Sequence, residues 1–367
     1  MDHASRTRNK MKKVLVTGVL GQDGANMVEY LLFKNEEPVK VYGMMRRSSI
    51  PNFTNAEKFR YHKDFEFVHG DLSDDVSLDN LVKRIQPDYF INFAANSFVG
   101  CSWDMPEQVM DVNALGVLRC LESIRKFKPD CRFYSAGSSE EWGDVDYAPQ
   151  DIDHPIKPRS PYGASKAAAR HLIKVYKESY GLYAVHGILF NHEGTKRGEE
   201  FVTRKITKGV ARIKNHLDTR ELALESFDPI ELGNLEAKRD WSDSEDFVEG
   251  VWLMLNQDEP KNYILSSGET HSIRDFLNKA FKHAGISGNW VDVEGEPLRT
   301  KFMLNSSMPE ALVVINEKFY RPAEVDLLLG DSTPIREELG WKPKVSFDNL
   351  VEKMVKWDIE LEKEKSS

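Results

Sequence analysis

The stretch Lys13-Val-Leu-Val-Thr-Gly18-Val-Leu-Gly21-Gln-Asp-Gly24 decides the fold. An apolar strand runs into three glycines spaced GxxGxxG, and a helical pattern over residues 25–34 follows directly. Glycines in this context allow a tight turn and a close approach of the backbone to a pyrophosphate at the positive end of the helix. The spacing differs from the commonest GxGxxG, and glycines alone are also typical of ordinary turns. The strand before and the helix after favour a nucleotide-binding turn.

Apolar runs alternate with helical patterns through the first half of the chain. Further strands are expected to start at Val39, Phe65, Asp88, Cys131 and Tyr183, and helices to span Val76–Gln86, Val109–Phe127 and Pro161–Tyr180. Such alternation, with strands that are apolar almost throughout, predicts a parallel sheet covered by helices on both faces. The sequence therefore predicts a doubly wound α/β domain of the Rossmann type.

Beyond about residue 200 the alternation loosens and polar stretches lengthen. Helices still recur, with starts predicted at the capping box of Ser272, at Thr333 and at Phe347. Because there is no internal repeat and no low-complexity linker, we expect the second part to pack on the first. The expected divisions are a disordered tail at residues 1–10, a nucleotide-binding domain at residues 11–200 to which later segments return, and a smaller C-terminal α/β substrate domain at residues 201–367.

The composition argues against several classes of protein. Lys and Arg total 50 against 59 Asp and Glu, a formal charge of −9, whereas affinity for nucleic acid depends on cationic side chains. No apolar run approaches the ~20 residues of a membrane span, and no apolar segment near the start indicates secretion. The three cysteines lack metal-ligand spacing and indicate reduced thiols. We expect a cytoplasmic globular protein without a metal site that binds neither nucleic acid nor membrane.

A basic segment follows the second predicted strand. An NAD-binding unit carries an acidic residue there, roughly 20 residues after the glycine turn, which holds the ribose 2′-hydroxyl. This chain has Arg46, Arg47 and Ser48 instead. Two guanidinium groups and a hydroxyl suit a 2′-phosphate through charge-assisted hydrogen bonds. The segment predicts NADP as the cofactor, and the alternative is a solvated basic loop.

Tyr162 and Lys166 are four residues apart in a predicted helix, so their side chains share one face. The pKa of a tyrosine is about 10, and we expect a nearby ammonium, together with an oxidised nicotinamide, to lower it toward that of a general base. Such pairs are also common on amphipathic surface helices. The position of this pair, after the fifth strand of a predicted nucleotide-binding sheet, favours a catalytic function.

Ser138, Ser139 and Glu140 follow the fifth predicted strand, at the edge where open α/β sheets bind their ligands. A hydroxyl there can orient a substrate hydroxyl for oxidation, and a carboxylate can carry out a second proton transfer. The alternative is an ordinary solvated turn. The position favours one catalytic hydroxyl and one catalytic glutamate.

These motifs and several in the second half resemble the GDP-mannose 4,6-dehydratases of the extended short-chain dehydrogenase/reductase superfamily. The resemblance runs from about Lys13 to Glu362 and rests on GVLGQDG from Gly18, HGDLSD from His69, FAANS from Phe93, GSSEEWG from Gly137, YGASK from Tyr162, ILFNHEGTKRGEEFVTRKIT from Ile188, LGN from Leu232 and YRPAEV from Tyr320. The segments of the second half are more specific than the glycine turn, because they belong to the substrate-binding part.

The resemblance implies a three-stage reaction on GDP-mannose with tightly held NADP. A hydride leaves sugar C4 while Tyr162, aided by Lys166 and Ser138, takes the hydroxyl proton. Glu140 then removes the C5 proton as water leaves C6, and the hydride returns to C6. The product is GDP-4-dehydro-6-deoxy-D-mannose, and the enzyme is a hydro-lyase.

The resemblance also assigns binding residues by matching motifs. The expected cofactor contacts are Gly18, Gly21, Gln22, Asp23, Gly24, Arg46, Arg47, Ser48, Asp71, Leu72, Phe93, Ala94, Ala95, Ser97, Tyr162, Lys166, His192 and Arg197. The expected contacts to the GDP-sugar are Ser97, Ser139, Asn191, Arg204, Lys205, Asn234, Arg239, Arg321 and Glu324. A cluster of arginines suits a diphosphate, whereas His192 taken alone would be interpreted as a structural histidine.

Several residues depart from the family pattern. Ser138 replaces the usual threonine and keeps its hydroxyl. Glu141 stands where leucine is usual, and this second carboxylate either raises the pKa of Glu140 by repulsion or points to the other side of the turn. Asn96 and Phe98 stand where the family has glutamine and histidine. The departures touch the sugar pocket more than the cofactor turn.

Two other functions remain open. A relative could act on another GDP-sugar or stop at C4 as a dehydrogenase, epimerase or reductase, although Glu140 favours elimination. A protein that only senses NADP would not need Tyr162 and Lys166, and both are present. The resemblance further implies a homodimer or a homotetramer.

Overall fold

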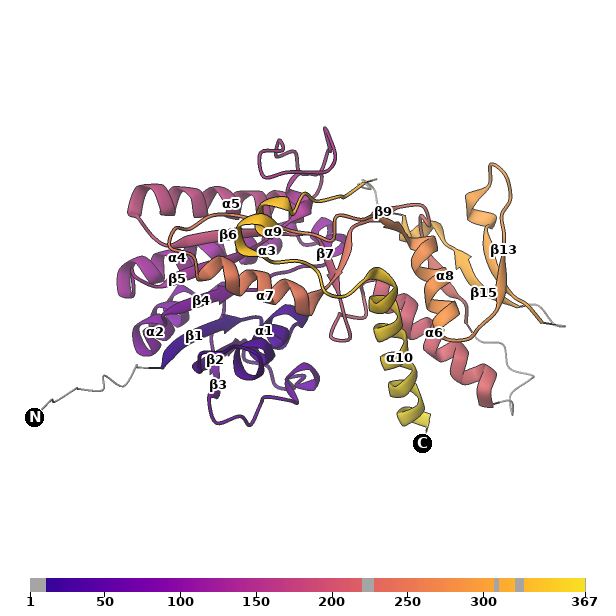
Figure 1. The fold of residues 1–367 in the computed structure, drawn as a ribbon, viewed down its shortest axis with the longest axis horizontal. Helices are drawn as coiled ribbons and strands as arrows, with labels where there is room; N and C mark the ends of the chain where they lie inside the picture. Colours follow the sequence, from indigo (N-terminus) through magenta and orange to yellow (C-terminus); the bar gives the residue numbers. More distant parts are fainter. Residues whose placement is uncertain (1–10, 220–227, 307–309, 321–326, 367) are drawn as a thin grey trace, which may run out of the picture.

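The computed structural model describes residues 11–219, 228–306, 310–320 and 327–366. Two parts lie side by side in Figure 1: a parallel sheet wrapped by helices, and a smaller α/β part built mainly from later residues. The first part contains most of the first half of the chain. The tail expected at residues 1–10 lies outside the described residues.

Among the described residues, seven parallel strands form the central sheet, in the order β11-β6-β5-β4-β1-β2-β3. Their bounds are β1 (Lys12–Thr17), β2 (Val39–Met45), β3 (Phe65–His69), β4 (Tyr89–Asn92), β5 (Arg132–Ser138), β6 (Ala184–Leu189) and β11 (Ile264–Leu265). The chain winds outward from β1 to β3 and then in the opposite direction from β4 to β6. Ligands bind at such a switch point in open α/β sheets. The predicted doubly wound fold is confirmed.

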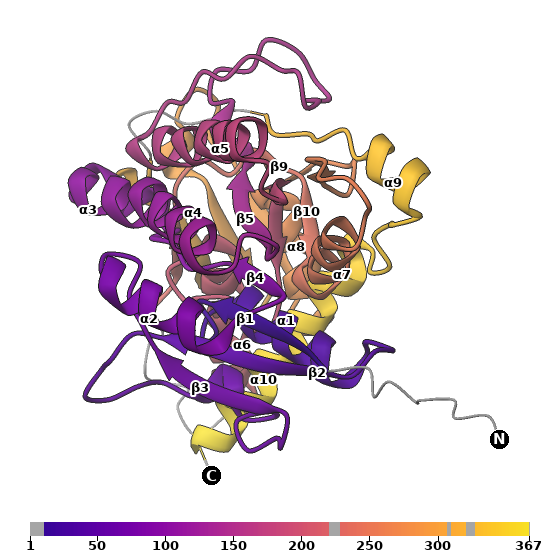
Figure 2. The ribbon, with the colours of Figure 1, turned by 90° about the vertical axis from the view of Figure 1, so that its left-hand side faces the viewer.

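Helices cover both faces of the central sheet (Figure 2). One face carries α2 (Asp75–Ile85), α4 (Gly116–Phe127) and α5 (Pro161–Tyr180), and the other carries α1 (Gln22–Phe33), α7 (Ser244–Leu255) and α9 (Thr333–Leu339). Alternate residues of a strand point to opposite faces. Val14 and Val16 accordingly pack beneath α1 and α7, while Leu15 packs beneath α2 and α4. Burial on both faces explains the uninterrupted apolar sequence of β1.

The helix expected over residues 109–127 is a composite. It consists of α3 (Pro106–Met110), a π-helical turn η3 (Asp111–Leu115) and α4. Asn113 in the π turn accepts the backbone N–H of Asn96 at 2.8 Å, and its amide donates to Ser165 Oγ at 3.1 Å. The turn thereby anchors the segment after β4 to α5, as π turns often do near functional sites.

The smaller part is a four-stranded sheet, in the order β13-β14-β15-β8, packed on three helices. Its elements are α6 (Val202–Thr219), β8 (Ile230–Leu232), α8 (Ile273–His283), β13 (Gly288–Val291), β14 (Lys301–Leu304), β15 (Ala311–Ile315) and α10 (Phe347–Ser366). A separate core that includes Phe276, Phe281 and Leu350 fills this part. The predicted capping box is confirmed, because Ser272 and Asp275 exchange hydrogen bonds at the start of α8.

Short elements complete the two parts. They are η1 (Thr54–Ala56), η2 (Val99–Trp103), η4 (Ser139–Glu141), β7 (Asn191–Glu193), β9 (Lys238–Arg239), β10 (Trp241–Asp243), β12 (His271–Ser272), η5 (Pro297–Arg299) and η6 (Glu317–Phe319). β10 pairs with β7 in parallel, and β12 pairs with β9 in antiparallel orientation.

The chain crosses between the two parts several times. After α6 and β8 in the smaller part, α7 packs on α1 and β11 joins the edge of the central sheet. The chain then returns to the smaller part for α8 and β13 to β15, packs α9 against α7, and ends in α10. The two parts are therefore interleaved in sequence.

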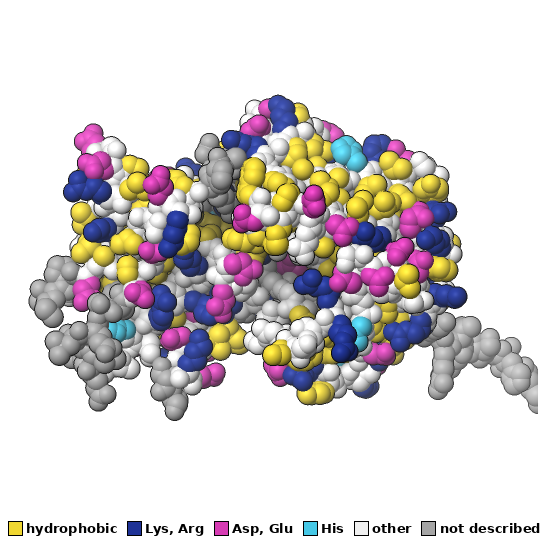
Figure 3. Space-filling model, turned by 180° about the vertical axis from the view of Figure 1, so that it is seen from behind, with side chains coloured by type: hydrophobic (Ala, Val, Ile, Leu, Met, Phe, Trp, Pro, Cys, Tyr) yellow, Lys and Arg dark blue, Asp and Glu magenta, His cyan; other side chains and the backbone are white. Residues whose placement is uncertain are grey.

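The surface carries both signs of charge. Figure 3 shows basic and acidic side chains interspersed over the face seen from behind. In the described ranges, no helix is long and apolar enough to cross a membrane. Burial raises the pKa of the Cys120 and Cys131 thiols, so both remain protonated and serve as packing residues.

Candidate active site

A cavity of about 1110 Å³ lies between the carboxyl ends of the central strands and the smaller part. Its wall includes residues that follow β1 to β6, the connection from β7 to α6, the segment from Leu232 to Arg239, and η6. Pockets for one small molecule usually measure roughly 300–1,000 Å³. At about 1110 Å³ the cavity is slightly larger than this range.

Most of the predicted site residues line this cavity. They are Gly18, Gly21, Gln22, Asp23, Gly24, Arg46, Ser48, Asp71, Leu72, Phe93, Ala94, Ala95, Ser97, Ser138, Ser139, Glu140, Tyr162, Lys166, Asn191, His192, Arg197, Lys205, Asn234 and Arg239. Arg47 and Arg204 are described but do not belong to the wall. Arg321 and Glu324 lie outside the described residues.

The glycine turn after β1 fits the pyrophosphate of a dinucleotide. Gly18 has a φ of +65°, and a Cβ on Gly24 would come within 2.2 Å of the Gly18 carbonyl oxygen. Gly21 is the N-cap of α1, and no side chain of the described residues caps it. The turn therefore leaves the first N–H groups of α1 for an anion, which the helix dipole favours.

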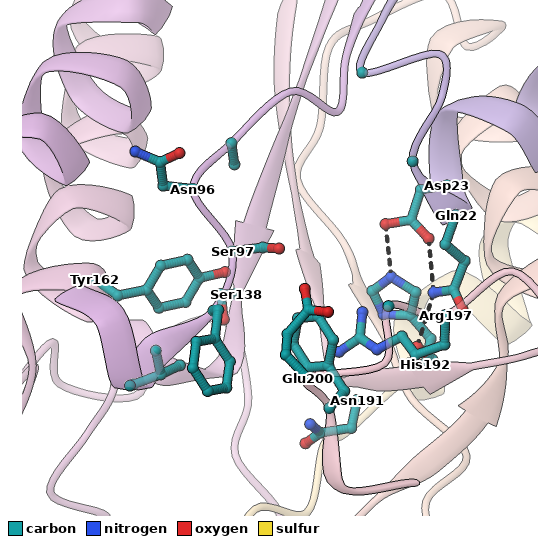
Figure 4. A pocket seen from close by; sticks show the side chains of 18 of the residues that line it. Gln22, Asp23, Asn96, Ser97, Ser138, Tyr162, Asn191, His192, Arg197 and Glu200 are labelled. Atoms are coloured by element: carbon teal, nitrogen blue, oxygen red, sulfur yellow. Dashed lines mark hydrogen bonds and ion pairs between the residues drawn. The ribbon is translucent and has the colours of Figure 1, made fainter. Parts of the chain in front are cut away.

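Asp23, in the first turn of α1, binds His192 of β7. His192 donates from Nε2 to Asp23 Oδ2 at 2.9 Å and from Nδ1 to the Phe190 carbonyl at 2.7 Å (Figure 4). Burial opposes the charge on Asp23, but His192 and then Arg197 hold the pKa of its carboxyl below the usual value. Burial likewise opposes the charge on His192, but Asp23 raises its pKa. Because both ring nitrogens of His192 face an oxygen acceptor, the pair is charged, and it fixes the imidazole in the cavity wall.

The basic segment after β2 presents only part of its charge to the cavity. Arg46 and Ser48 line the wall, and Arg47 between them is exposed outside it. Successive side chains of an extended segment point to opposite sides, so two adjacent arginines do not face one ligand. The expectation for Arg47 is therefore not supported by its position.

Tyr162 and Lys166 lie on the face of α5 that meets the cavity. Ser160 caps α5 and Pro161 opens it, which fixes the helix start beside Tyr162. Both functional side chains are buried. Lys166 Nζ donates to the Ala136 carbonyl at 2.7 Å and lies 5.8 Å from the centre of the Tyr162 ring.

Burial shifts the pKa values of both side chains. It raises the pKa of Tyr162 to about 12, while a hydrogen bond with Ser138 and the charge of Arg197 oppose the rise. It lowers the pKa of Lys166 to about 8, and Lys166 Nζ donates to the Ala136 carbonyl. The expected lowering of the Tyr162 pKa, which depends on the ammonium together with an oxidised nicotinamide, stays a prediction.

The turn η4 contains two adjacent glutamates, Glu140 and Glu141, whose side chains point to different sides. Ser138 Oγ accepts the N–H of Glu140 at 3.2 Å, and Glu141 Oε1 accepts the N–H of Ser138 at 2.9 Å. Glu140 lines the cavity, whereas Glu141 is fully buried on the other side. Of the two alternatives for Glu141, the structure supports the one in which it points away from the site.

On the side of the smaller part, the cavity wall is built from side chains of separate segments. Lys205 Nζ lies 3.3 Å from the centre of the Phe319 ring. Burial lowers the pKa of the Lys205 ammonium, and Glu231 opposes this effect. Arg239 is buried, and its Nη1 donates to the Lys238 carbonyl at 2.8 Å. Cationic groups in these positions suit the diphosphate of a nucleotide-sugar.

Arg204 faces away from this wall. Its Nε donates to both carboxylate oxygens of Asp358, at 3.0 and 2.9 Å, and its Nη1 donates to the Thr195 carbonyl. Adjacent residues on a helix point about 100° apart, so Arg204 ties α6 to α10 while Lys205 faces the cavity. The expected contact of Arg204 with substrate is not supported.

Two residues of the cavity wall, Asn55 and Lys196, were not predicted from the sequence. Asn55 donates to the carbonyls of Leu20 and Lys196, at 3.1 and 3.3 Å, and Lys196 Nζ donates to Asn26 Oδ1 at 2.7 Å. These bonds close the wall between the glycine turn and the connection after β7. Lys196 lies inside the quoted run from Ile188, whereas no local pattern marks Asn55.

Comparison with known proteins identifies the family of this chain. The family model for GDP-mannose 4,6 dehydratase matches residues 15–354. The GDP-mannose 4,6 dehydratase of Drosophila melanogaster is 41% identical over 362 residues, which cover 95% of this chain and 87% of that protein. The enzyme of the same name from Homo sapiens is 40% identical over 356 residues, which cover 95% of this chain and 91% of that protein.

Solved structures share the fold at lower identity. RMD of Pseudomonas aeruginosa complexed with NADPH has a TM-score of 0.72 and 22% identity, covering 96% of this chain and 100% of that chain. DesIV, a dTDP-glucose 4,6-dehydratase of Streptomyces venezuelae with NAD and TYD bound, has a TM-score of 0.76 and 22% identity, covering 95% of this chain and 97% of that chain. Because the family model and the relatives match nearly the whole chain, this protein belongs to the GDP-mannose 4,6-dehydratase family.

Proposed function

We propose that this protein is a GDP-mannose 4,6-dehydratase that converts GDP-mannose to GDP-4-dehydro-6-deoxy-D-mannose with bound NADP. The observation that carries the proposal is the meeting of Ser138, Glu140, Tyr162 and Lys166 in one cavity with a glycine turn on one side and cationic side chains on the other. A phenol and a carboxylate of different strength serve an alcohol proton and a carbon acid.

Each catalytic side chain has one task in this reaction. Tyr162 takes the proton of the C4 hydroxyl after the charges of Lys166 and of the bound cofactor have lowered its pKa, and Ser138 Oγ orients that hydroxyl beside it. Glu140 removes the C5 proton, which the C4 ketone has made acidic, and passes it to the C6 hydroxyl, which leaves as water. The proton that Tyr162 took goes to C5 when the hydride reaches C6. When bound, NADP supplies the hydride acceptor for C4 and the hydride donor for C6, and its oxidised ring adds a positive charge near Tyr162. The balance is the loss of one water with no net oxidation.

The binding roles follow the two walls. Residues 11–200 and the segments that return to the sheet hold NADP, with the glycine turn at the pyrophosphate and Arg46 and Ser48 at the 2′-phosphate. Residues 201–367 mainly hold the GDP-sugar, through Lys205 and Arg239. The alternative is a related GDP-sugar 4-dehydrogenase, epimerase or reductase, or a dehydratase of another GDP-sugar. Glu140 at the cavity favours elimination.

Incubation with GDP-mannose, followed by mass spectrometry, tests the proposal. We expect a product that has lost one water without consumption of added NADPH. No mass change, or a requirement for stoichiometric NADPH, would contradict it. As a control, Tyr162→Phe is expected to lower kcat by about 10³-fold while NADP remains bound.

A cytoplasmic homodimer or homotetramer completes the proposal. The support for this part is the family to which the chain belongs. Light scattering on the purified protein measures the oligomeric state, and a monomer at micromolar concentration would contradict this part.

A further inference from the structure

Glu141 lies beneath the catalytic turn, and the reaction above does not use it. Its side chain is 0% exposed although it directly follows the catalytic Glu140. Oε1 accepts the N–H of Ser138 at 2.9 Å and the Nε2–H of His186 at 2.8 Å. Oε2 lies 3.8 Å from Nη1 of Arg170. One buried carboxylate thus contacts β5, β6 and α5.

The backbone leaves room for this contact. A Cβ on Gly137 would lie 2.4 Å from His186 Nε2 and 2.8 Å from Glu141 Oε1. Buried ion pairs cost desolvation, and apolar residues of similar volume are often at least as stable. Stability alone is therefore a weak reason for a carboxylate here.

The charge of Glu141 affects the pKa of both Tyr162 and Lys166 on α5. Burial lowers the pKa of Lys166, and Glu141 is the first charge that opposes this decrease. Burial raises the pKa of Tyr162, and Glu140 and Glu141 add to that increase. A negative charge at Glu141 thus shifts the pKa of both groups upward.

Glu141 itself is ionised at neutral pH. Burial opposes its charge, but His186 on β6, then Arg170 on α5 and the Ser138 N–H hold the pKa of its carboxyl below the usual value. The charged and titratable groups that interact with it are these two side chains and, on α5, Lys166 and Tyr162. Asp23 also raises the pKa of Lys166, and Glu140 and Arg197 act on Tyr162 in opposite directions.

We propose that Glu141 is a positioning residue for the dehydration: its carboxylate fixes the turn that presents Ser138 and Glu140, and it supplies the counter-charge of Lys166. The proposal rests on the proposed function and adds a residue to it. The two tasks are separable, because the first needs only a hydrogen-bond acceptor and the second needs a charge.

Two variants separate these tasks. Glu141→Gln keeps an acceptor for the Ser138 N–H and removes the charge, whereas Glu141→Leu removes both. We expect kcat for GDP-mannose to fall about 100-fold in Glu141→Leu and about 10-fold in Glu141→Gln, with KM within about 3-fold of the wild type in both. We also expect the pH profile of kcat in Glu141→Gln to move to lower pH, because Tyr162 and Lys166 both lose the same upward influence.

A second measurement needs no substrate. Competitive acetylation of the full protein with acetic anhydride over a pH series, read by mass spectrometry, gives the apparent pKa of Lys166. We expect that value to be lower in Glu141→Gln than in the wild type.

Asp246→Asn is the matched control. Asp246 is a buried carboxylate of α7 outside the cavity wall, and it accepts the backbone N–H groups of Lys344 and Val345 at 2.8 and 3.0 Å. Its loss is expected to lower the melting temperature without moving the pH profile or the labelling of Lys166.

The outcomes are distinct. An unchanged pH profile and unchanged Lys166 labelling in Glu141→Gln would overturn the counter-charge, and a kcat in Glu141→Leu equal to that of the wild type would overturn the positioning of the turn. If the wild type does not dehydrate GDP-mannose, the proposed function fails, but the labelling of Lys166 still tests the counter-charge. If Glu141→Leu does not fold, Glu141→Gln decides the proposal.

Discussion

The two sides of the cavity are built by different means. The side that we propose for the cofactor is shaped by the backbone, because the turn has no room for a side chain at Gly18 or Gly24. The side that we propose for the substrate is shaped by side chains such as Lys205 and Arg239, which come from separate segments of the chain. A backbone site is destroyed by one added methyl group, whereas a side-chain site loses its contacts one at a time.

The largest effect is expected for Gly24→Ala. Its Cβ would lie 2.2 Å from the Gly18 carbonyl oxygen, so the turn must open and the N-terminus of α1 must move. We expect the affinity for NADPH, measured by its fluorescence, to fall more than about 100-fold. The control Gly21→Ala, whose Cβ would meet the same oxygen at 3.2 Å, is expected to lose much less. Equal affinities of the two variants for NADPH would contradict the claim that the proposed cofactor wall depends on the close backbone contact at Gly24.

A smaller and one-sided effect is expected for Arg239→Met. Removal of the buried guanidinium weakens the substrate wall and leaves the glycine turn intact. We expect KM for GDP-mannose to rise about 10-fold to 100-fold, while the Kd of NADP stays within about 2-fold. An equal loss in both constants would show that the walls are not independent.

The ion pair between Asp23 and His192 joins α1 to β7 within the proposed cofactor wall, and its contribution to stability depends on pH. Asp23 has a lowered pKa, so its contribution is present above the unfolded value of about 3.9 and is lost as pH falls through the lower folded value. His192 has a raised pKa, so its contribution is complete below about 6.5 and is lost as pH rises through the higher folded value.

We therefore expect His192→Gln to lower the free energy of unfolding by about 1–2 kcal/mol between pH 4 and 6.5, and by less at higher pH. Denaturant unfolding of both proteins over this pH range measures the difference. A deficit that grows above pH 8 would contradict the charged pair.

The smallest effect is expected for Arg47→Ala. Arg46 lines the cavity and Arg47 does not, so we expect the affinity for NADP to change less than about 2-fold in Arg47→Ala and to fall about 10-fold in Arg46→Ala. Titration with NADPH measures both. A larger loss in Arg47→Ala would place its side chain at the 2′-phosphate and would restore the expectation drawn from the sequence.

Local features of the sequence predicted the parts of the site that local structure determines. The glycine turn is contiguous, and Tyr162 and Lys166 share a face of one helix, so spacing alone placed them correctly. The capping box at Ser272 is local in the same sense. These features need no knowledge of the rest of the fold.

Long-range packing determined what the sequence could not predict. β11 has only two residues, and its strand conformation depends on pairing with β6. Arg204 and Lys205 are neighbours in sequence, but only the position of Asp358 decides which one faces the cavity. The pKa of Tyr162 follows from its burial, and no spacing pattern reports burial depth.

The interleaving of the two parts has a consequence for biosynthesis. The core of the central sheet includes Ile335 of α9, and the core of the smaller part includes Leu350 and Val355 of α10. Both helices follow all the other described elements in the chain, so neither core can close while residues beyond about 333 are still in the exit tunnel. A premature stop before α9 would therefore harm both walls of the cavity at once, even though the glycine turn has already been made.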